Sequence, residues 1–211
     1  MKGQFFLISG IAVIIVLILI KSSLNLADII ERKRYLEIGL ERKEFSNIRG
    51  ELTNTVELTY NKNETENVNK YIVYVKQRLK YRAVDFNGIA VGSSFKNVVA
   101  GANTGLNVTV LNFLGETMSS LNLTFSYDGS NHVFSNVADN STVKWDFTFN
   151  TSSDVNYTLA VNYTTTSENK QYSVQIPVEI GKRKFIGFFD LKTKSPRTDN
   201  KDEFSKVVET V

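Results

Sequence analysis

The sequence lacks several kinds of residue that whole classes of function require. It has no cysteine among its 211 residues, one histidine (His132) and two prolines. The absence of cysteine excludes a disulfide scaffold, thiolate zinc sites, iron–sulfur clusters and a cysteine nucleophile. A single histidine excludes a histidine-based metal cluster. Few prolines beside 14 phenylalanines and 9 tyrosines are not typical of a disordered chain.

The charge is nearly balanced overall but unevenly distributed along the chain. The formal net charge is only +3, which argues against a dedicated nucleic-acid binder. Residues 21–86 carry 13 Lys/Arg and 10 Asp/Glu, residues 87–180 carry 3 and 7, and residues 181–211 carry 8 and 5. These shifts predict four regions: a membrane segment with a short leader (1–23), a helical stalk or hairpin (24–82), a β-sandwich head (83–190) and a polar flexible tail (191–211).

An apolar run near the N-terminus predicts a membrane-spanning helix. Residues 4–20 contain no charged side chain, and seventeen helical residues extend about 25 Å, the short end of what spans a bilayer. The run is apolar on every face, so it is not an amphipathic surface helix. A cleaved secretory signal and a buried core helix are the alternatives.

The first residues carry a family resemblance. Lys2, Gly3 and Gln4, followed at once by apolar residues, resemble the class III signal peptide of archaeal type IV pilins and pilin-like surface proteins. The resemblance implies cleavage after Gly3 by a prepilin-type peptidase and retention of the apolar helix as an anchor. Pilins usually carry Glu at the fifth mature position, where this chain has Ile8. We therefore expect processing but weak self-assembly or none. An ordinary anchor that begins with MKGQ is the alternative.

Residues 24–82 show the apolar spacing of helices. The first stripe comprises Leu26, Ile29, Ile30, Leu36, Leu40, Ile48, Leu52 and Val56, with Gly39 and Gly50 as weak points. A polar break at 61–66 precedes a second stripe of Val68, Ile72, Val75 and Leu79. This pattern predicts an αα-hairpin, or a helix that packs on the following sheet. The basic residues on these helices indicate either a solvated face or attraction to acidic lipid headgroups.

Residues 83–190 show the period of antiparallel strands. Apolar and polar side chains alternate over 121–127, 143–149, 155–163 and 172–180, with breaks at turn-forming residues. Seven to nine short strands predict a two-sheet sandwich that folds without the helices. The segment 105–129 is similar to immunoglobulin-like adhesion modules of archaeal surface proteins. Trp145 is predicted to lie in the core, and 204–211 to form a short terminal helix.

Motifs for catalysis and cofactor binding are missing from the sequence. It has no glycine-rich phosphate loop, GxSxG elbow, HExxH or EF-hand pattern. His132 is interpreted as a partly exposed strand residue. The acidic residues Asp128, Asp139, Asp146 and Asp154 match no calcium loop, so turn-forming aspartate is the better interpretation. The sequence therefore predicts a protein that is not an enzyme and that has no cofactor and no metal site.

Acceptor motifs for N-glycosylation are enriched. Seven Asn-x-Ser/Thr sequons occur, where 21 asparagines and 36 serines plus threonines in 211 residues give about 3.6 by chance. The predicted glycosylation sites are Asn63, Asn107, Asn122, Asn140, Asn150, Asn156 and Asn162. Asparagine is depleted in strands, so its recurrence on their polar side favours glycan acceptors. A composition rich in Asn and Thr that generates sequons by itself is the alternative.

Two arguments about membrane orientation conflict. The Lys/Arg residues soon after the apolar run favour a cytoplasmic head, whereas the sequons and the pilin-like leader favour an extracellular one. We give more weight to the second set, because the basic residues are interleaved with Asp28 and Glu31.

The prediction for function is a single-pass, membrane-anchored α+β surface protein with an extracellular head. It would act in adhesion, envelope scaffolding or as a minor filament component. The partners expected are membrane lipid, the peptidase, other pilin-like subunits and envelope or S-layer components. A non-polymerising, stator-like binding subunit is the alternative, and a membrane-tethered enzyme is a remote one.

Overall fold

The structure is a computed structural model that describes residues 2–59, 64–82, 84–195 and 199–210. The chain divides into two compact units, residues 1–44 and residues 45–211, which are described separately. The helices are α1 (Lys2–Thr59) and α2 (Glu64–Lys80). The strands are β1 (Asp85–Phe95), β2 (Asn103–Asn112), β3 (Met118–Phe125), β4 (Asn131–Val137), β5 (Ser141–Asn150), β6 (Val155–Thr164), β7 (Asn169–Val178), β8 (Arg183–Lys194) and β9 (Asp199–Thr210).

The first unit consists of the N-terminal part of α1. Its backbone is helical from Lys2, and Gly39, a predicted weak point, lies inside the helix with no atom that would crowd an added Cβ. The side chains of residues 2–14, 17, 18, 20, 22, 24, 25 and 27 lie outside the described ones. Within the described residues, we find no helical stretch that is both long and apolar enough to cross a membrane.

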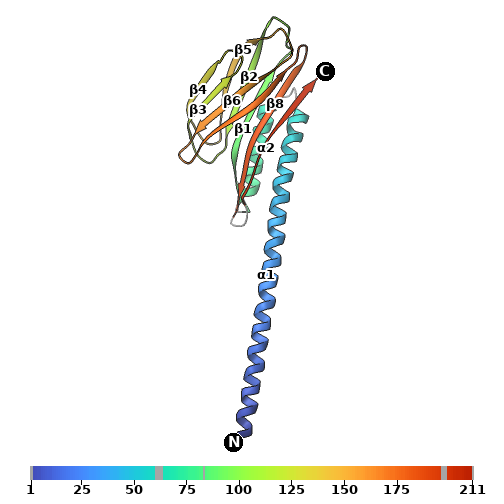
Figure 1. Cartoon of the computed structure of the whole chain (residues 1–211), viewed down its shortest axis with the longest axis vertical. Helices are drawn as coiled ribbons and strands as arrows, with labels where there is room; N and C mark the ends of the chain where they lie inside the picture. The colour runs from blue at the N-terminus through green and yellow to red at the C-terminus, as the bar shows by residue number, and fades with distance from the viewer. Residues whose placement is uncertain (1, 60–63, 83, 196–198, 211) are drawn as a thin grey trace. The chain divides into compact units, whose positions relative to one another are not determined.

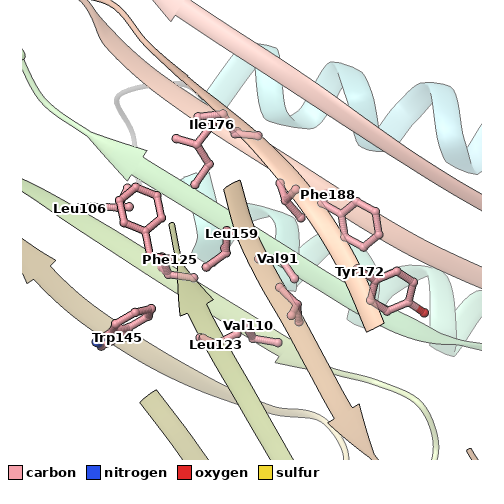
Figure 2. Close-up of a cluster of buried hydrophobic side chains, with 14 of the residues drawn as sticks. Val91, Leu106, Val110, Leu123, Phe125, Trp145, Leu159, Tyr172, Ile176 and Phe188 are labelled. Atoms are coloured by element: carbon pink, nitrogen blue, oxygen red, sulfur yellow. The ribbon is translucent and has the colours of Figure 1, made fainter. Parts of the chain in front are cut away.

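The second unit contains two antiparallel sheets that face each other (Figure 1). One sheet has the strand order β5-β2-β1-β8-β9, and the other has the order β4-β3-β6-β7. Their facing sides form one apolar core, in which Leu123, Phe125 and Leu159 are fully buried and Trp145 is 8% exposed (Figure 2). The predictions of an antiparallel sandwich and of a core tryptophan are therefore confirmed.

A second apolar core lies on the other face of the five-stranded sheet. Residues 45–59 of α1 and the helix α2 cover this face, which Figure 1 shows for α2. Helix side chains such as Leu52 and Ile72 pack against Phe86, Phe113 and Phe189 from the strands. The predicted domain boundary at 82/83 is thus wrong, because the helical residues 45–80 share a core with the sheet and belong to its compact unit.

The C-terminus differs from the prediction. Residues 191–211 are not a polar flexible tail: β8 continues to Lys194, and β9 pairs with it from Lys194↔Asp199 to Arg183↔Thr210. The expected terminal helix at 204–211 is also wrong, since residues 204–210 belong to this strand. The prediction of a flexible tail rested on the polar composition of this segment. Pairing with β8 supplies the backbone hydrogen bonds that its composition alone did not indicate.

Candidate functional site

The outward face of the four-stranded sheet is polar but carries no charge. The outward side chains are Ser120, Asn122, Thr124, Asn131, Val133, Ser135, Asn156, Thr158, Ala160, Asn162, Thr164, Asn169, Gln171, Ser173, Gln175 and Pro177. Strands β3, β4, β6 and β7 together contain one Lys, Arg, Asp or Glu, which is Lys170. Lys170 has the same strand parity as the core residue Tyr172, so it faces the other sheet. The open face is therefore a dense array of amides and hydroxyls.

Three sequon asparagines lie on this face, which we call the amide face. Asn122 on β3 and Asn162 on β6 are directly opposite each other in the register. The Oδ1 atoms of both are buried and have no hydrogen-bond partner among the described residues. Asn156 lies near the start of β6 and is exposed. The alternation of the sequence predicted that these asparagines lie on the polar side of their strands, and the structure places those strands next to each other in one sheet.

Three other sequon asparagines use their Nδ2 atom within the fold. The Nδ2 of Asn107 donates to the carboxylate of Asp146, and that of Asn150 donates to the carbonyl of Gly101 at 3.2 Å. The Nδ2 of Asn140 donates to Asp139 Oδ2 at 2.5 Å. Asn140 also has a positive φ of 58°, which suits an asparagine in a turn. Asn63 lies outside the described residues.

An ion-pair network connects the two sheets at one end of the core. Asp190 on β8 is 1% exposed, and its Oδ2 accepts hydrogen bonds from the Tyr172 hydroxyl and, at 3.0 Å, from Lys170 Nζ. Burial raises the pKa of the Tyr172 phenol, and its hydrogen bond to Asp190 raises it further. A buried carboxylate is tolerable only with such partners, so the network acts as a polar clamp between β7 and β8.

Glu168 extends this clamp. Its two carboxylate oxygens each lie 3.0 Å from Lys192 Nζ, and one accepts a hydrogen bond of 2.8 Å from the Tyr163 hydroxyl. Burial disfavours the charged form of Glu168, but the hydrogen bonds from Lys192 and Tyr163 outweigh it and lower the pKa of the carboxyl. Sequence reasoning missed this network. The available signal was Asp190, a charged residue inside the apolar run of β8.

A shallow groove of about 470 Å³ lies on the outward side of the five-stranded sheet, beyond the residues that the helices cover. Gly105 contributes to its hollow shape because it has no side chain. Lys96, Arg183 and Asp146 place charges of both signs around it, and Asn107 is also part of its lining. Asp146 accepts a hydrogen bond from Asn107 within this lining.

Three acidic side chains outside the strands accept hydrogen bonds from backbone amides. Asp128 accepts from the amide of Ser130 at 2.8 Å, Asp139 from Gly115 at 2.9 Å, and Asp154 from Ile180 at 2.8 Å. Asp128 and Asp139 lie in turns, as predicted, whereas Asp154 directly precedes β6 and Asp146 lies inside β5, so the turn interpretation is wrong for Asp146. Over the described ranges, no three His, Asp or Glu side chains are grouped as metal ligands would be.

His132 is exposed at the edge strand β4, as predicted for a strand residue. Its ring is stacked 6.1 Å from that of Trp145 and lies edge-on to Phe134 at 4.4 Å.

The predicted processing residues Lys2, Gly3 and Gln4 belong to the backbone of α1, but their side chains lie outside the described ones. Cleavage after Gly3 therefore stays a prediction.

No protein-family model matches the chain, and no curated protein matches it.

Proposed function

We propose that this chain is a membrane-anchored, pilin-like surface protein that presents an immunoglobulin-like sandwich outside the cell. The observation that carries the proposal is the start of α1. Its uncharged run, 4–20, lies in one helix, and the described aliphatic side chains Ile15, Val16 and Leu19 are 52%, 53% and 63% exposed. Such side chains are stabilised by an apolar surrounding, which lipid or neighbouring apolar helices would supply.

The amide face supports an extracellular head. The sheet that carries the amide face has two edge strands, β4 without charges and β7 with only Lys170. It therefore has few of the charged edge residues that usually prevent pairing with other strands. Glycans on Asn122, Asn156 and Asn162 would provide a bulky hydrophilic cover. In N-glycosylation the asparagine Nδ2 atom bonds to the anomeric carbon of a sugar that is linked to a lipid pyrophosphate. The Nδ2 atom loses a proton, the bond from the anomeric carbon to the pyrophosphate oxygen breaks, and the lipid pyrophosphate leaves.

The missing acid at Ile8 supports a limited role in filaments. Cleavage after Gly3 would leave Gln4 with a free ammonium group, and the first acidic residue after it is Asp28. At 1.5 Å per residue this acid lies about 36 Å further along the helix, too far to neutralise the ammonium within one subunit. The chain therefore acts as an anchored adhesion or scaffolding subunit, or as a minor filament component.

The membrane and orientation parts are tested together on intact cells. Alkaline carbonate should leave the full chain in the membrane pellet, and external protease should remove the head. A head that resists protease until the membrane is broken would reverse the orientation. Extraction of the chain by carbonate would show that it is not anchored in the membrane.

The glycan part is tested by two matched triple variants. Asn122→Gln, Asn156→Gln and Asn162→Gln together should remove most of any mass above the 23.8 kDa of the chain. Asn107→Gln, Asn140→Gln and Asn150→Gln together should remove little, because their Nδ2 atoms are used within the fold. Equal losses of mass from the two triple variants would contradict the assignment of the glycans to the amide face. A wild-type chain without added mass would show that the protein carries no glycans.

A further inference from the structure

Most of the exposed apolar side chains of the first unit lie on one stripe of α1, and Val16, Ile30 and Tyr35 lie off it. Leu26, Ile29, Leu36 and Leu40 are between 59% and 69% exposed, although all are large aliphatic residues. They follow a seven-residue repeat that begins inside the apolar run. One position of the repeat comprises Leu19, Leu26, Lys33 and Leu40, and the other comprises Ile15, Ser22, Ile29 and Leu36.

A seven-residue repeat with two apolar positions is the pattern of a coiled-coil seam. The other sides of the same segment carry Asp28, Glu31 and Arg34, which are exposed and polar. Apart from Tyr35, the apolar residues thus gather on one side of this segment, and a partner helix that carries the same repeat would cover them.

We propose that residues 15–40 of α1 form a parallel, in-register coiled coil with further copies of this chain. The proposal rests on the proposed function in one respect, since a shared membrane would orient the copies in parallel and raise their effective concentration. The seam is self-complementary, because identical layers of Leu26, Ile29, Leu36 and Leu40 meet in register. This arrangement differs from the axially staggered packing of subunits in a filament.

The charges of the segment allow identical copies to approach each other. Residues 24–44 carry five Asp/Glu and five Lys/Arg, so the segment has no net charge. Arg32 Nη2 lies 3.1 Å from Asp28 Oδ2 in the same helix. The exception is Lys33, which interrupts the seam itself and has a long contact of 4.0 Å with Glu37. Ser22 is the second polar residue of the seam. Polar residues in a seam fix the register and weaken the assembly.

The absence of native cysteine makes the test direct. Leu36→Cys, on the seam, and Arg34→Cys, on the opposite side at nearly the same height, are compared in the full-length chain in native membranes under mild oxidation. Two sulfurs link only when their Cα atoms come within about 7 Å, so Leu36→Cys should give at least about fivefold more covalent dimer. Adding Lys33→Leu to Leu36→Cys should increase the yield further.

The register is tested by mixing variants. Leu26→Cys and Leu40→Cys, co-expressed with distinguishable tags, should each link to themselves and not to each other. Abundant mixed dimers would show a staggered arrangement, and equal yields for Leu36→Cys and Arg34→Cys would overturn the coiled coil. If carbonate extracts the protein but Leu36→Cys still links selectively, the anchor fails and the coiled coil stands. If the protein stays in the membrane without selective linking, the coiled coil alone fails.

Discussion

The two sheets of the sandwich differ in how they use charge. The five strands β5, β2, β1, β8 and β9 contain fourteen Lys, Arg, Asp and Glu residues, whereas the four strands of the other sheet contain one. The charged sheet is nevertheless the more deeply buried, because helices cover part of its second face. Its charges lie at strand ends, at the edges or in the clamp around Asp190. The uncharged sheet leaves its whole outward face open.

The two sheets contribute unequally to the packed interior. The five-stranded sheet is the structural centre, with an apolar core on each side, and β8 is buried from Lys184 to Leu191. Its buried charges require partners, as Asp190 has in Lys170 and Tyr172. The amide face of the four-stranded sheet has no such structural duty, so its composition is available for glycans or for contacts outside the molecule.

The largest effect is expected when the helical residues 45–80, which cover the five-stranded sheet, are removed. A fragment of residues 45–211 should be a soluble monomer with cooperative unfolding. A fragment of 83–190, which sequence reasoning expected to fold, should aggregate or stay unfolded. It exposes Phe86, Leu111, Phe113 and Phe189, at about 1.5–3 kcal/mol each, against a typical total stability of about 5–15 kcal/mol. Circular dichroism and size-exclusion chromatography measure this, and a cooperatively folded 83–190 would contradict it.

A lysine introduced on the helix-covered face of one sheet and on the amide face of the other should change the free energy of unfolding by very different amounts. Ala90→Lys places a charge in the core between helices and sheet, where Ala90 is 5% exposed, and should cost about 3–5 kcal/mol. Ser173→Lys on the amide face should stay within about 0.5 kcal/mol. Urea unfolding of the 45–211 fragment compares the two variants. Similar losses would mean that the amide face is covered as well.

A smaller effect is expected at a glycine in the centre of the five-stranded sheet. A Cβ on Gly88 would lie 2.0 Å from the backbone carbonyl oxygen of Asp190. Gly88→Ala should therefore cost about 1–3 kcal/mol through displacement of β8. Gly105→Ala is the control, because no atom lies within 4 Å of its added Cβ, and it should be neutral or slightly stabilising. Thermal unfolding distinguishes them, and a tolerated Gly88→Ala would show that β1 and β8 can separate locally.

The smallest effect concerns the clamp. The pKa of Glu168 is lowered in the folded state, so its contribution is fully present above its ordinary value of 4.5 and is lost as the pH falls through the lower folded value. Glu168→Gln should lose about 1 kcal/mol at pH 7, and the difference from wild type should shrink below pH 4.5. The exposed pair of Glu66 and Lys70 is the control, and Glu66→Gln should change stability less. A pH-independent difference would show that Glu168 acts through packing.

Part of this structure follows from local sequence pattern. Alternation such as Leu121–Leu123–Phe125 predicts strands with one buried side, and Trp145 follows the same alternation into the core. The same rule places Asn122, Asn156 and Asn162 on the outward side. The amphipathic spacing of Val68, Ile72, Val75 and Leu79 predicts a helix with one buried face. In each case the information lies within a few residues, because the side-chain period is a local property of the backbone.

The sequence by itself determined the helix α2, the strands β3, β5, β6 and β7, and the sides that these elements bury. Only the tertiary structure decided that 45–80 cover the five-stranded sheet, that 199–210 form β9, and that Asp190 meets Lys170. These features depend on pairing between segments far apart in the chain. No local period encodes such pairing, since a strand such as β9 is fixed by the partner that supplies its backbone hydrogen bonds.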